Sequence, residues 1–425
     1  MNEERYDVVI VGGRVAGATL AALLGRRGLD VLLLENTRFP SDTLSTHLIF
    51  GDSFSVWEEA GAWPEIAAIG AEPMEWVDWQ RLPPSTDLRV RIRAPGGHRV
   101  TLCLRRIKLD AILFANAANT RGVTAREGTK ATELAWEGSR VVGVRYRAGG
   151  GRGRPAVARA PVVVGADGRS SFVGNSTGAP YYNVVPPRNF PFYTYYRDVE
   201  PIDPPAFQIW ESVEAHGTVM LIPCDDGIWL GVVYTPQAEY DEFRRDHERL
   251  FEERMRADPR IGRRLARARR IAPVRGRGDL VNFMRVPAGR GWALVGDAGQ
   301  HKDPIFGQGI GDSCRSATLL ARHLEAGLGG DLDGALAAYH AYRDDDLLPK
   351  YDLMINGRAA GVSQDDFDLI VREAGLDDSL AFHFVNIFTG GLKVHDVFNA
   401  AVVEWWKEQR AGRRGGRRSA TRLAS

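Results

Sequence analysis

The stretch from Gly291 to Ala321 carries residues whose types and order could bind a flat, hydroxylated ligand. Asp297 follows a short apolar run, which predicts a carboxylate at the carboxyl end of a buried strand, where open α/β sheets bind ligands. Gly307 and Gly309 have no side chains, so backbone can approach a planar ring there. A helix expected from about Ile310 directs its positive N-terminus at that ring and favours a negative charge. Together these features describe a flavin site, although an ordinary strand–loop–helix would show the same pattern.

A second chemical pattern lies at the start of the chain. The apolar run Tyr6–Val11, a glycine-rich turn, an Ala/Leu-rich helix and a second apolar run ending at Glu35 fit one βαβ nucleotide-binding unit. Gly12 would make the tight turn, Gly17 would let the helix pack on the sheet, and Glu35 would bind a ribose. Arg14 occupies the second glycine position of this fingerprint, so we expect its guanidinium to turn towards phosphate. The alternative is a βαβ unit that binds no nucleotide.

Further candidate ligand contacts follow two other predicted strands. Asp167 and Gly168 come after an apolar strand, which repeats the pattern seen at Asp297. The polar segment that contains Arg38, Ser45 and His47 would cross back over a ligand in a doubly wound sheet, so these three are candidates for cofactor or substrate contact. A solvated loop explains any one of them equally well.

Size and composition limit the class of protein. A chain of 425 residues predicts two or three domains, and the net charge of +1 argues against a nucleic-acid partner. Cys103, Cys224 and Cys314 are too far apart to suggest a disulfide framework or a metal site, so we expect a reducing cytoplasm and no bound metal. No signal peptide is recognisable, and no apolar run approaches the roughly 20 residues that cross a bilayer.

The middle of the chain is rich in alternating strands. Residues 88–104 predict a hairpin, and the aromatic strands of residues 181–234 predict an antiparallel sheet. Alternation would place Tyr193 and Tyr195 on one face of a strand, and Trp210 belongs to the same aromatic set. This sheet could roof a pocket for an aromatic or polyene substrate. An aromatic-packed core would explain the residues equally well.

Three signatures, in order along the chain, carry a family resemblance. GGRVAG with Glu35, then GADGRSS, then GDAGQHKDPIFGQG resemble the single-component FAD-dependent monooxygenases of the p-hydroxybenzoate hydroxylase type. Their wider superfamily also holds geranylgeranyl reductases and flavin-dependent halogenases. The resemblance covers roughly the first 345 residues and implies an FAD site. The candidate cofactor-binding residues are Gly12, Gly13, Arg14, Ala16, Gly17, Glu35, Arg38, Ser45, Arg106, Asp167, Gly168, Asp297, Pro304, Gly307, Gly309 and Ile310.

The resemblance also implies roles for individual residues. Gly12 and Gly17 would face the ADP pyrophosphate, and Glu35 would bind the adenosine ribose. Arg106 would contact the diphosphate and ribityl region, and Asp297 the ribityl chain. Pro304 with Gly307 and Gly309 would line the flavin ring. Asp167–Gly168 resembles a pair associated with both FAD and NAD(P)H.

The sequence departs from the family at four places besides its reaction-specific motifs. These are Arg14 for the middle glycine, Gly174 for arginine, Gln300 for histidine, and Gly311 for asparagine or threonine. The Gly174 departure weakens the inference of an NAD(P)H site. Halogenases use an N-terminal lysine and a W-x-W-x-I-P stretch, whereas the first lysine here is Lys108 and residues 218–223 keep only Ile-Pro. Geranylgeranyl reductases have a Phe-Pro-Lys core in the same region, whereas this chain has Ile222-Pro223-Cys224.

Because neither of these specialised signatures is present, the sequence predicts oxygen insertion. NAD(P)H would reduce FAD, and a flavin C4a-hydroperoxide would hydroxylate or epoxidise an aromatic or polyketide- or terpenoid-like molecule, as in natural-product tailoring. His47, Tyr193, Tyr195 and Trp210 are candidates for substrate contact or acid–base help. The expected partners are a small-molecule substrate, O2 and either NAD(P)H or a separate flavin reductase, with no nucleic acid and no integral membrane association. The alternatives are a reductase that saturates a C=C bond and a flavoprotein that only carries electrons.

The expected architecture is α/β. We expect a Rossmann-like FAD-binding domain with an inserted antiparallel β-sheet substrate domain and a helical C-terminal region. The boundaries are residues 1–75, 100–180 and 275–345 for the first, 76–99 and 181–274 for the second, and 346–408 for the third. Residues 409–425 would form a disordered basic tail.

Overall fold

A parallel sheet forms the centre of the predicted FAD-binding half in the computed structural model, which describes residues 3–82, 86–92, 98–212, 217–374 and 377–413. Its strand order is β21-β22-β12-β2-β3-β8, and only β21 at the edge runs antiparallel. Every residue of β2, β3 and β12 is buried, as expected for apolar strands covered on both faces. The strands are β2 (Val8–Val11), β3 (Val31–Leu34), β8 (Val123–Arg126), β12 (Val162–Gly165), β21 (Ala288–Gly289) and β22 (Trp292–Leu294).

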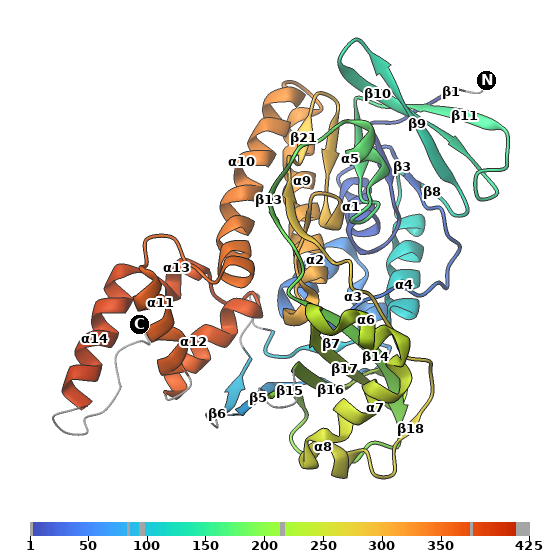
Figure 1. Cartoon of the computed structure of the whole chain (residues 1–425). Coiled ribbons are helices and arrows are strands. Elements are labelled where there is room, and N and C mark those ends of the chain that lie inside the picture. The colour runs from blue at the N-terminus through green and yellow to red at the C-terminus, as the bar shows by residue number, and fades with distance from the viewer. Residues whose placement is uncertain (1–2, 83–85, 93–97, 213–216, 375–376, 414–425) are drawn as a thin grey trace.

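Helices cover one face of this sheet and a small second sheet covers the other (Figure 1). Apolar side chains of α1 (Val15–Arg26), α4 (Arg106–Asn119) and α9 (Gly309–Gly327) share one core with Val8, Ile10 and Leu33. The opposite side chains, among them Val9 and Leu32, pack against the four-stranded sheet β1-β11-β10-β9. The strands of that sheet are β1 (Glu3–Arg5), β9 (Lys130–Glu137), β10 (Arg140–Arg147) and β11 (Pro155–Arg159).

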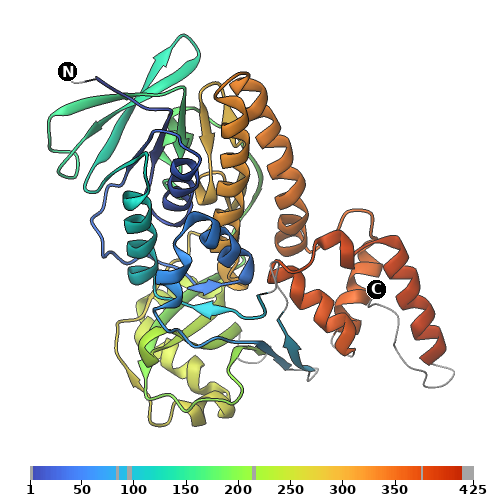
Figure 2. The ribbon, with the colours of Figure 1, turned by 180° about the vertical axis from the view of Figure 1, so that it is seen from behind.

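A larger sheet lies at the other end of the molecule, as Figure 2 shows from behind. Its order is β18-β14-β17-β16-β15-β5-β6, with β19 also paired to β14. One face belongs to a core with Leu48 and Val385, and helices α6 to α8 pack on the other face. The main strands are β5 (Trp76–Leu82), β6 (Thr86–Arg91), β14 (Asn189–Arg197), β15 (Ala206–Ser212), β16 (Gly217–Pro223) and β17 (Trp229–Pro236). The helices are α6 (Tyr240–Arg245), α7 (His247–Ala257) and α8 (Pro259–Arg264).

Two predictions about strand pairing were wrong. Residues 88–104 do not form a hairpin, because β6 pairs with β5, and β7 (Leu102–Cys103) pairs with β4 (Leu48–Ile49). The predicted turn at residues 95–97 lies outside the described residues. β13 (Tyr181–Val185) is also not part of the large sheet, since it pairs with β20 (Asn282–Arg285).

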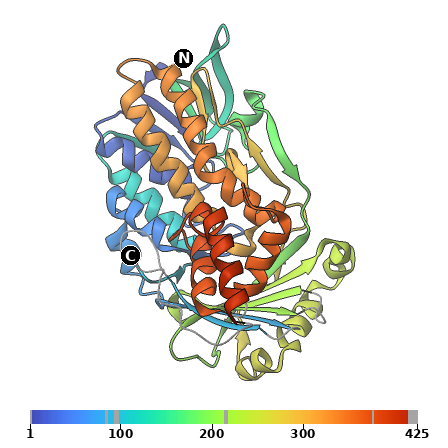
Figure 3. The same ribbon diagram turned by 90° about the vertical axis from the view of Figure 1, so that its left-hand side faces the viewer.

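The remaining helices follow the predicted FAD-binding half. α10 (Leu332–Tyr351) packs along α9, and the C-terminal helices form a cluster with its own apolar core beside β5 and β6 (Figure 3). These are α11 (Gln364–Ala374), α12 (Asp378–Phe388), α13 (Val394–Val397) and α14 (Ala400–Arg413). The prediction of disorder from residue 409 was wrong as far as Arg413, which ends α14; residues 414–425 lie outside the described chain. In the part of the chain that is described, no helix is long and apolar enough to cross a membrane, and no cluster of metal ligands occurs.

Candidate functional site

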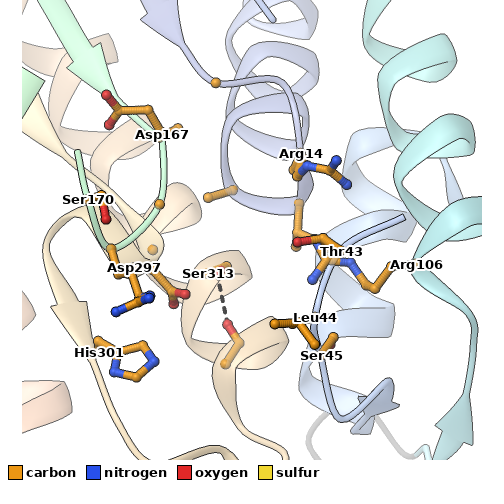
Figure 4. Close-up of a pocket in the computed structure, with 18 of the residues that line it drawn as sticks. Arg14, Thr43, Leu44, Ser45, Arg106, Asp167, Ser170, Asp297, His301 and Ser313 are labelled. Carbon is orange, nitrogen blue, oxygen red and sulfur yellow. Dashed lines mark hydrogen bonds between the residues drawn. The ribbon is translucent and has the colours of Figure 1, made fainter. Parts of the chain in front are cut away.

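A cavity of about 890 Å³ lies where the carboxyl ends of β2, β3 and β12 meet the N-terminal ends of α1 and α9. Its wall continues over residues 43–46 and onto β14 and β17 of the large sheet. In Figure 4, Arg14 and Arg106 lie on one side of this cavity, and Asp167, Ser170 and Asp297 lie on the other. The volume is at the upper end of the roughly 300–1,000 Å³ that ligand pockets span, so a dinucleotide-sized molecule fits.

The glycine-rich turn after β2 brings backbone unusually close to backbone. Gly12 has φ +102°, and a Cβ placed on it would come within 2.3 Å of the Ala166 carbonyl oxygen. A Cβ on Gly17 would come within 1.8 Å of the Gly12 carbonyl oxygen. These glycines therefore let α1 begin directly at the cavity, with its N-terminal amides available to an anion.

Two arginines share one buried carboxylate beside this turn. Asp110 is fully buried, and Arg106 donates to both of its oxygens at 2.8 and 3.0 Å. Arg14 pairs with the same carboxylate and donates to the Ser41 hydroxyl at 2.8 Å. The expectation that the Arg14 guanidinium turns towards phosphate differs from this arrangement, because Asp110 and Ser41 already bind it. One carboxylate against two guanidiniums leaves a net positive charge on this side of the cavity.

Glu35 closes the end of β3. Its carboxylate is 6% exposed and accepts hydrogen bonds from the backbone N–H groups of Gly13 and Thr37, both at 2.7 Å. The bond to Gly13 holds the glycine turn against β3. Glu35 also lines the cavity, as a residue that binds a ribose must.

The opposite side carries the other two predicted carboxylates. Asp167 accepts from the Ser171 hydroxyl at 2.5 Å and from the Val173 N–H at 3.2 Å, and burial raises its pKa. Asp297 lies just past β22, is exposed to the cavity, and is the less constrained of the two. Its position suits a ligand that supplies hydroxyl donors.

A buried ion pair in the wall was not predicted from the sequence. The Lys302 ammonium lies 2.8 Å from the Asp312 carboxylate, and the two side chains are 5% and 7% exposed. Lys302 also donates to the Gln308 side-chain oxygen at 2.9 Å. The spacing of lysine and aspartate on either side of a glycine-rich turn was the signal available. Burial raises the pKa of the neighbouring Asp303 to about 6.

The start of α4 also joins the cavity to the large sheet. Arg105 binds the carboxylate of Asp225 with its Nε and a terminal nitrogen, at 3.0 and 2.7 Å, and Lys108 binds Asp226 at 2.7 Å. Asp225 is fully buried. Burial alone would raise the pKa of Asp225, but the hydrogen bonds from Arg105 hold it well below its ordinary value.

Of the four candidate catalytic residues, three lie together. His47 is fully buried, its Nδ1 is 2.6 Å from the Ser45 carbonyl and its Nε2 is 2.5 Å from the Tyr195 hydroxyl. Because a carbonyl only accepts, Nδ1 carries the proton and the Tyr195 hydroxyl donates to Nε2. The rings of Tyr193 and Tyr195 are 5.8 Å apart, which confirms that they share a strand face. Tyr193 lines the cavity, its hydroxyl is buried without a partner among the described residues, and burial raises its pKa to about 12.

The structure does not bring Trp210 to this group. Side chains alternate along β15, so Phe207 and Ile209 face the core with Tyr193, whereas Trp210 points to the other face of the sheet. There its indole N–H donates to Gln80 at 2.8 Å. Trp210 therefore lies away from the cavity, and the prediction that it contacts the substrate or assists acid–base chemistry there was wrong.

Burial of His47 predicts a specific loss of stability in acid. Burial lowers the pKa of His47 to about 3, whereas an unfolded histidine titrates near 6.5. Between these values the unfolded chain binds a proton that the folded chain does not, so the free energy of unfolding falls by about 1.4 kcal/mol per pH unit as pH falls. Urea unfolding at pH 7 and pH 5, with saturating FAD, should show about 2 kcal/mol more loss in the wild type than in His47→Asn. Asparagine suits the φ of +63° at this position and does not titrate, so equal losses would contradict the prediction.

Most of the candidate cofactor residues line the cavity. Four do not: Gly13 and Gly17 lie behind it in the turn and the first helix, Gly307 packs against Leu48, and Arg38 is exposed on the surface. The lining residues are Gly12, Arg14, Ala16, Glu35, Ser45, Arg106, Asp167, Gly168, Asp297, Pro304, Gly309 and Ile310.

Two further observations show that the cavity fits FAD. A Cβ on Gly309 would meet no atom within 4 Å, so the start of α9 presents bare backbone on which a ring can lie. Both polar atoms of the Gln300 amide are buried without a partner among the described residues, and this residue also lines the cavity. Such orphaned groups are expected where a ligand supplies the missing hydrogen bonds.

Comparison with known proteins gives the family. The chain is 32% identical over 178 residues to 6-methylpretetramide 4-monooxygenase of Streptomyces rimosus, which covers 41% of each chain. It is 25% identical over 424 residues to digeranylgeranylglycerophospholipid reductase of Methanosarcina acetivorans, which covers 93% of this chain and 92% of the relative. The structure of a flavin-dependent brominase aligns with a TM-score of 0.79 at 20% identity, over 96% of this chain and all of the other, and supports the fold. A family model described as FAD binding domain matches residues 5–346, so the chain belongs to this family of FAD-dependent oxidoreductases.

Proposed function

We propose that the protein is a monooxygenase that uses FAD, NAD(P)H and O2 to hydroxylate or epoxidise an aromatic or polyketide- or terpenoid-like small molecule, as in natural-product tailoring. One observation carries the proposal: the cavity that joins the three FAD motifs continues onto the inner face of the large sheet, at Pro191, Tyr193 and Val232. An electron carrier has no use for such a wall. The likeness to 6-methylpretetramide 4-monooxygenase supports an oxygenase.

The residues of the cavity divide the binding of FAD between them. The N-terminus of α1 would hold the pyrophosphate, with the net positive charge of the Arg14–Arg106–Asp110 group beside it. Glu35 would bind the adenosine ribose and Asp297 the ribityl chain. The N-terminus of α9 would stabilise negative charge on the reduced ring. Bound FAD supplies the redox chemistry, and the protein contributes orientation, electrostatics and exclusion of water.

Tyr193 is the residue that we propose to face the substrate. Its free hydroxyl would hydrogen-bond an oxygen of the substrate, while Tyr195 and His47 behind it hold the strand face in place. Burial keeps His47 neutral and the Tyr193 phenol protonated near neutral pH, so Tyr193 would act as a hydrogen-bond donor rather than as a base.

Two positions bear on the source of electrons. Asp167–Gly168 lines the cavity and supports direct use of NAD(P)H, whereas Gly174 occupies a family arginine position and favours a separate flavin reductase. The three cysteines are buried free thiols, which agrees with a proposed cytoplasmic location where NAD(P)H is available.

Anaerobic mixing of the FAD-loaded protein with NADPH and then with NADH tests the proposal. We expect rapid bleaching of the flavin, acceleration by substrates found in a panel of aromatic and polyketide compounds, and product that incorporates oxygen after O2 is admitted. Tyr193→Phe should bind FAD normally and should turn over about tenfold more slowly, because it loses one hydrogen bond of roughly 1 kcal/mol or slightly more. Product formed without O2 would identify a C=C reductase and overturn the proposal, and product that appears only with halide would identify a halogenase.

A further inference from the structure

The turn that carries Asp297 is attached at both ends to a helix that does not reach the cavity. Asp297 belongs to a single helical turn, Gly296–Ala298, and its side chain is exposed to the cavity (Figure 4). The backbone of this turn therefore decides where the carboxylate lies. Leu294 precedes the turn and Gly299 follows it, and the carbonyl oxygens of both accept hydrogen bonds from side chains of α10.

Tyr339 supplies the first of these bonds. Its side chain is fully buried, and its hydroxyl donates to the Leu294 carbonyl oxygen at 2.8 Å. Leu294 is the last residue of β22, so the bond fixes the point at which the strand ends. The ring of Tyr339 packs in the apolar core, where a phenylalanine ring would pack as well. The hydroxyl therefore serves the end of the strand rather than the packing of the helix.

Arg343 lies one turn further along α10 and supplies the second bond. Its terminal nitrogens donate to the Gly299 carbonyl at 3.0 Å and to the Arg285 carbonyl at 2.7 Å. The backbone N–H of Arg285 donates to the same Gly299 oxygen at 2.9 Å. One guanidinium thus joins β20 to the end of the Asp297 turn. Asp344 balances the charge, since one of its oxygens lies 2.8 Å from Nε of Arg343.

A buried guanidinium is a costly way to attach a helix. The Arg343 side chain is only 2% exposed, and apolar side chains of similar volume often stabilise a fold as well or better. α10 already packs on α9 through apolar residues such as Leu336. The guanidinium adds geometry, because its planar fork binds two carbonyl oxygens in a fixed arrangement. Attachment of α10 alone therefore does not explain this residue.

We propose that Tyr339 and Arg343 are positioning residues, which fix both ends of the turn and so hold the Asp297 carboxylate where the ribityl chain of FAD binds. Neither is among the residues that line the cavity, so they act through the turn rather than by touching the cofactor. The inference rests on the proposed function only for the contact between Asp297 and the ribityl chain, and not for the reaction with oxygen.

Tyr339→Phe in the full chain tests the inference, because it removes one hydroxyl and keeps the ring in the core. Titration of the apoprotein with FAD and, separately, with ADP compares a ligand that reaches Asp297 with one that ends at the diphosphate. We expect Tyr339→Phe to weaken FAD binding about fivefold, because binding must then order the turn, and to leave ADP affinity unchanged. Tyr342→Phe is the matched control, since it removes the hydroxyl of an exposed tyrosine of the same helix and should change neither affinity.

Arg343→Lys is a second variant, which keeps the positive charge beside Asp344. A single ammonium cannot reproduce the planar fork that binds two carbonyl oxygens, so we expect FAD affinity to fall about tenfold and ADP affinity to stay the same. Urea unfolding and the visible spectrum of bound FAD check that each variant is folded.

A double-variant cycle with Asp297→Ala shows whether the two residues act through this carboxylate. Asp297→Ala alone should weaken FAD binding about tenfold, and Tyr339→Phe in that background should weaken it further by less than about twofold. Additive losses, an equal loss for FAD and ADP, or normal FAD binding by Asp297→Ala would overturn the inference. None of these titrations requires turnover, so they decide the inference even if the chain reduces a C=C bond instead of inserting oxygen.

Discussion

Gly12→Ala should weaken FAD binding by about a hundredfold, which corresponds to roughly 2.7 kcal/mol. The added Cβ would lie 2.3 Å from the carbonyl oxygen and 2.6 Å from the carbonyl carbon of Ala166, both backbone atoms. At φ +102° alanine also carries conformational strain. The turn and the end of β12 must therefore separate, which moves the N-terminus of α1 away from the pyrophosphate. Titration of the apoprotein with FAD, followed by quenching of flavin fluorescence, gives the dissociation constant.

Gly28→Ala is the matched control for this change. Gly28 has φ +83°, and a Cβ there would meet no atom within 4 Å. It therefore has comparable backbone strain, worth about 1–2 kcal/mol of stability, without the collision. We expect it to bind FAD as tightly as the wild type, and a similar loss of FAD affinity in both variants would show that strain rather than the collision is responsible.

Lys302→Met should destabilise the fold by about 3 kcal/mol, because it leaves the carboxylate of Asp312 buried without its partner. The Gln308 side-chain oxygen loses a donor in the same step. The unpaired carboxylate would also repel the anionic reduced flavin, so the reduction potential of bound FAD should become more negative. Urea unfolding and a potential titration with reference dyes measure the two effects separately.

The double variant Lys302→Met/Asp312→Leu checks that charge imbalance is the cause. Replacing both members of a buried ion pair by apolar residues is often close to neutral, so most of the lost stability and potential should return. If the loss in the free energy of unfolding for the double variant equalled the sum of the losses for Lys302→Met and Asp312→Leu, the two residues would not act as a pair.

The FAD-binding half could be predicted because its signals are local in the sequence. Val8–Val11 and Val31–Leu34 are continuous apolar runs, each followed by a glycine or a carboxylate, and such runs form strands that are buried on both faces wherever they lie. Gly12 directly follows β2 and Asp297 comes three residues after the end of β22, so their place at the edge of the sheet follows from the strands themselves. This is why most of the candidate cofactor residues line one cavity.

The large sheet could not be predicted in the same way because its pairing is not local. β15 pairs in parallel with β5, more than a hundred residues earlier, and this pairing brings Trp210 against Gln80 instead of towards the cavity. An alternating strand specifies two faces but not which of them is covered by which neighbour. The same limit hid the contact of the C-terminal helices with this sheet, since Val385 shares one core with strands far away in the sequence.

The pairing of Lys302 with Asp312 was hidden for a different reason. Lys302 lies in the third motif and Asp312 follows the motif by three residues, but the loop between them decides whether the side chains meet or diverge. The loop geometry depends on Gly307 at φ +68°. Charged residues near a helix start are usually solvated, so burial was the decisive and unpredictable fact.

The ion pairs at the start of α4 connect the large sheet to the wall of the cavity. Arg105 holds the turn between β16 and β17 through Asp225, and the adjacent residue, Arg106, lines the cavity beside Asp110. Adjacent residues of α4 and its N-cap thus contact the large sheet and the wall of the cavity. A displacement of that turn must either break these buried ion pairs or carry the end of α4 with it. Because these two bonds lie on adjacent residues, we expect a shift of the sheet to move the cavity wall at Arg106 as well.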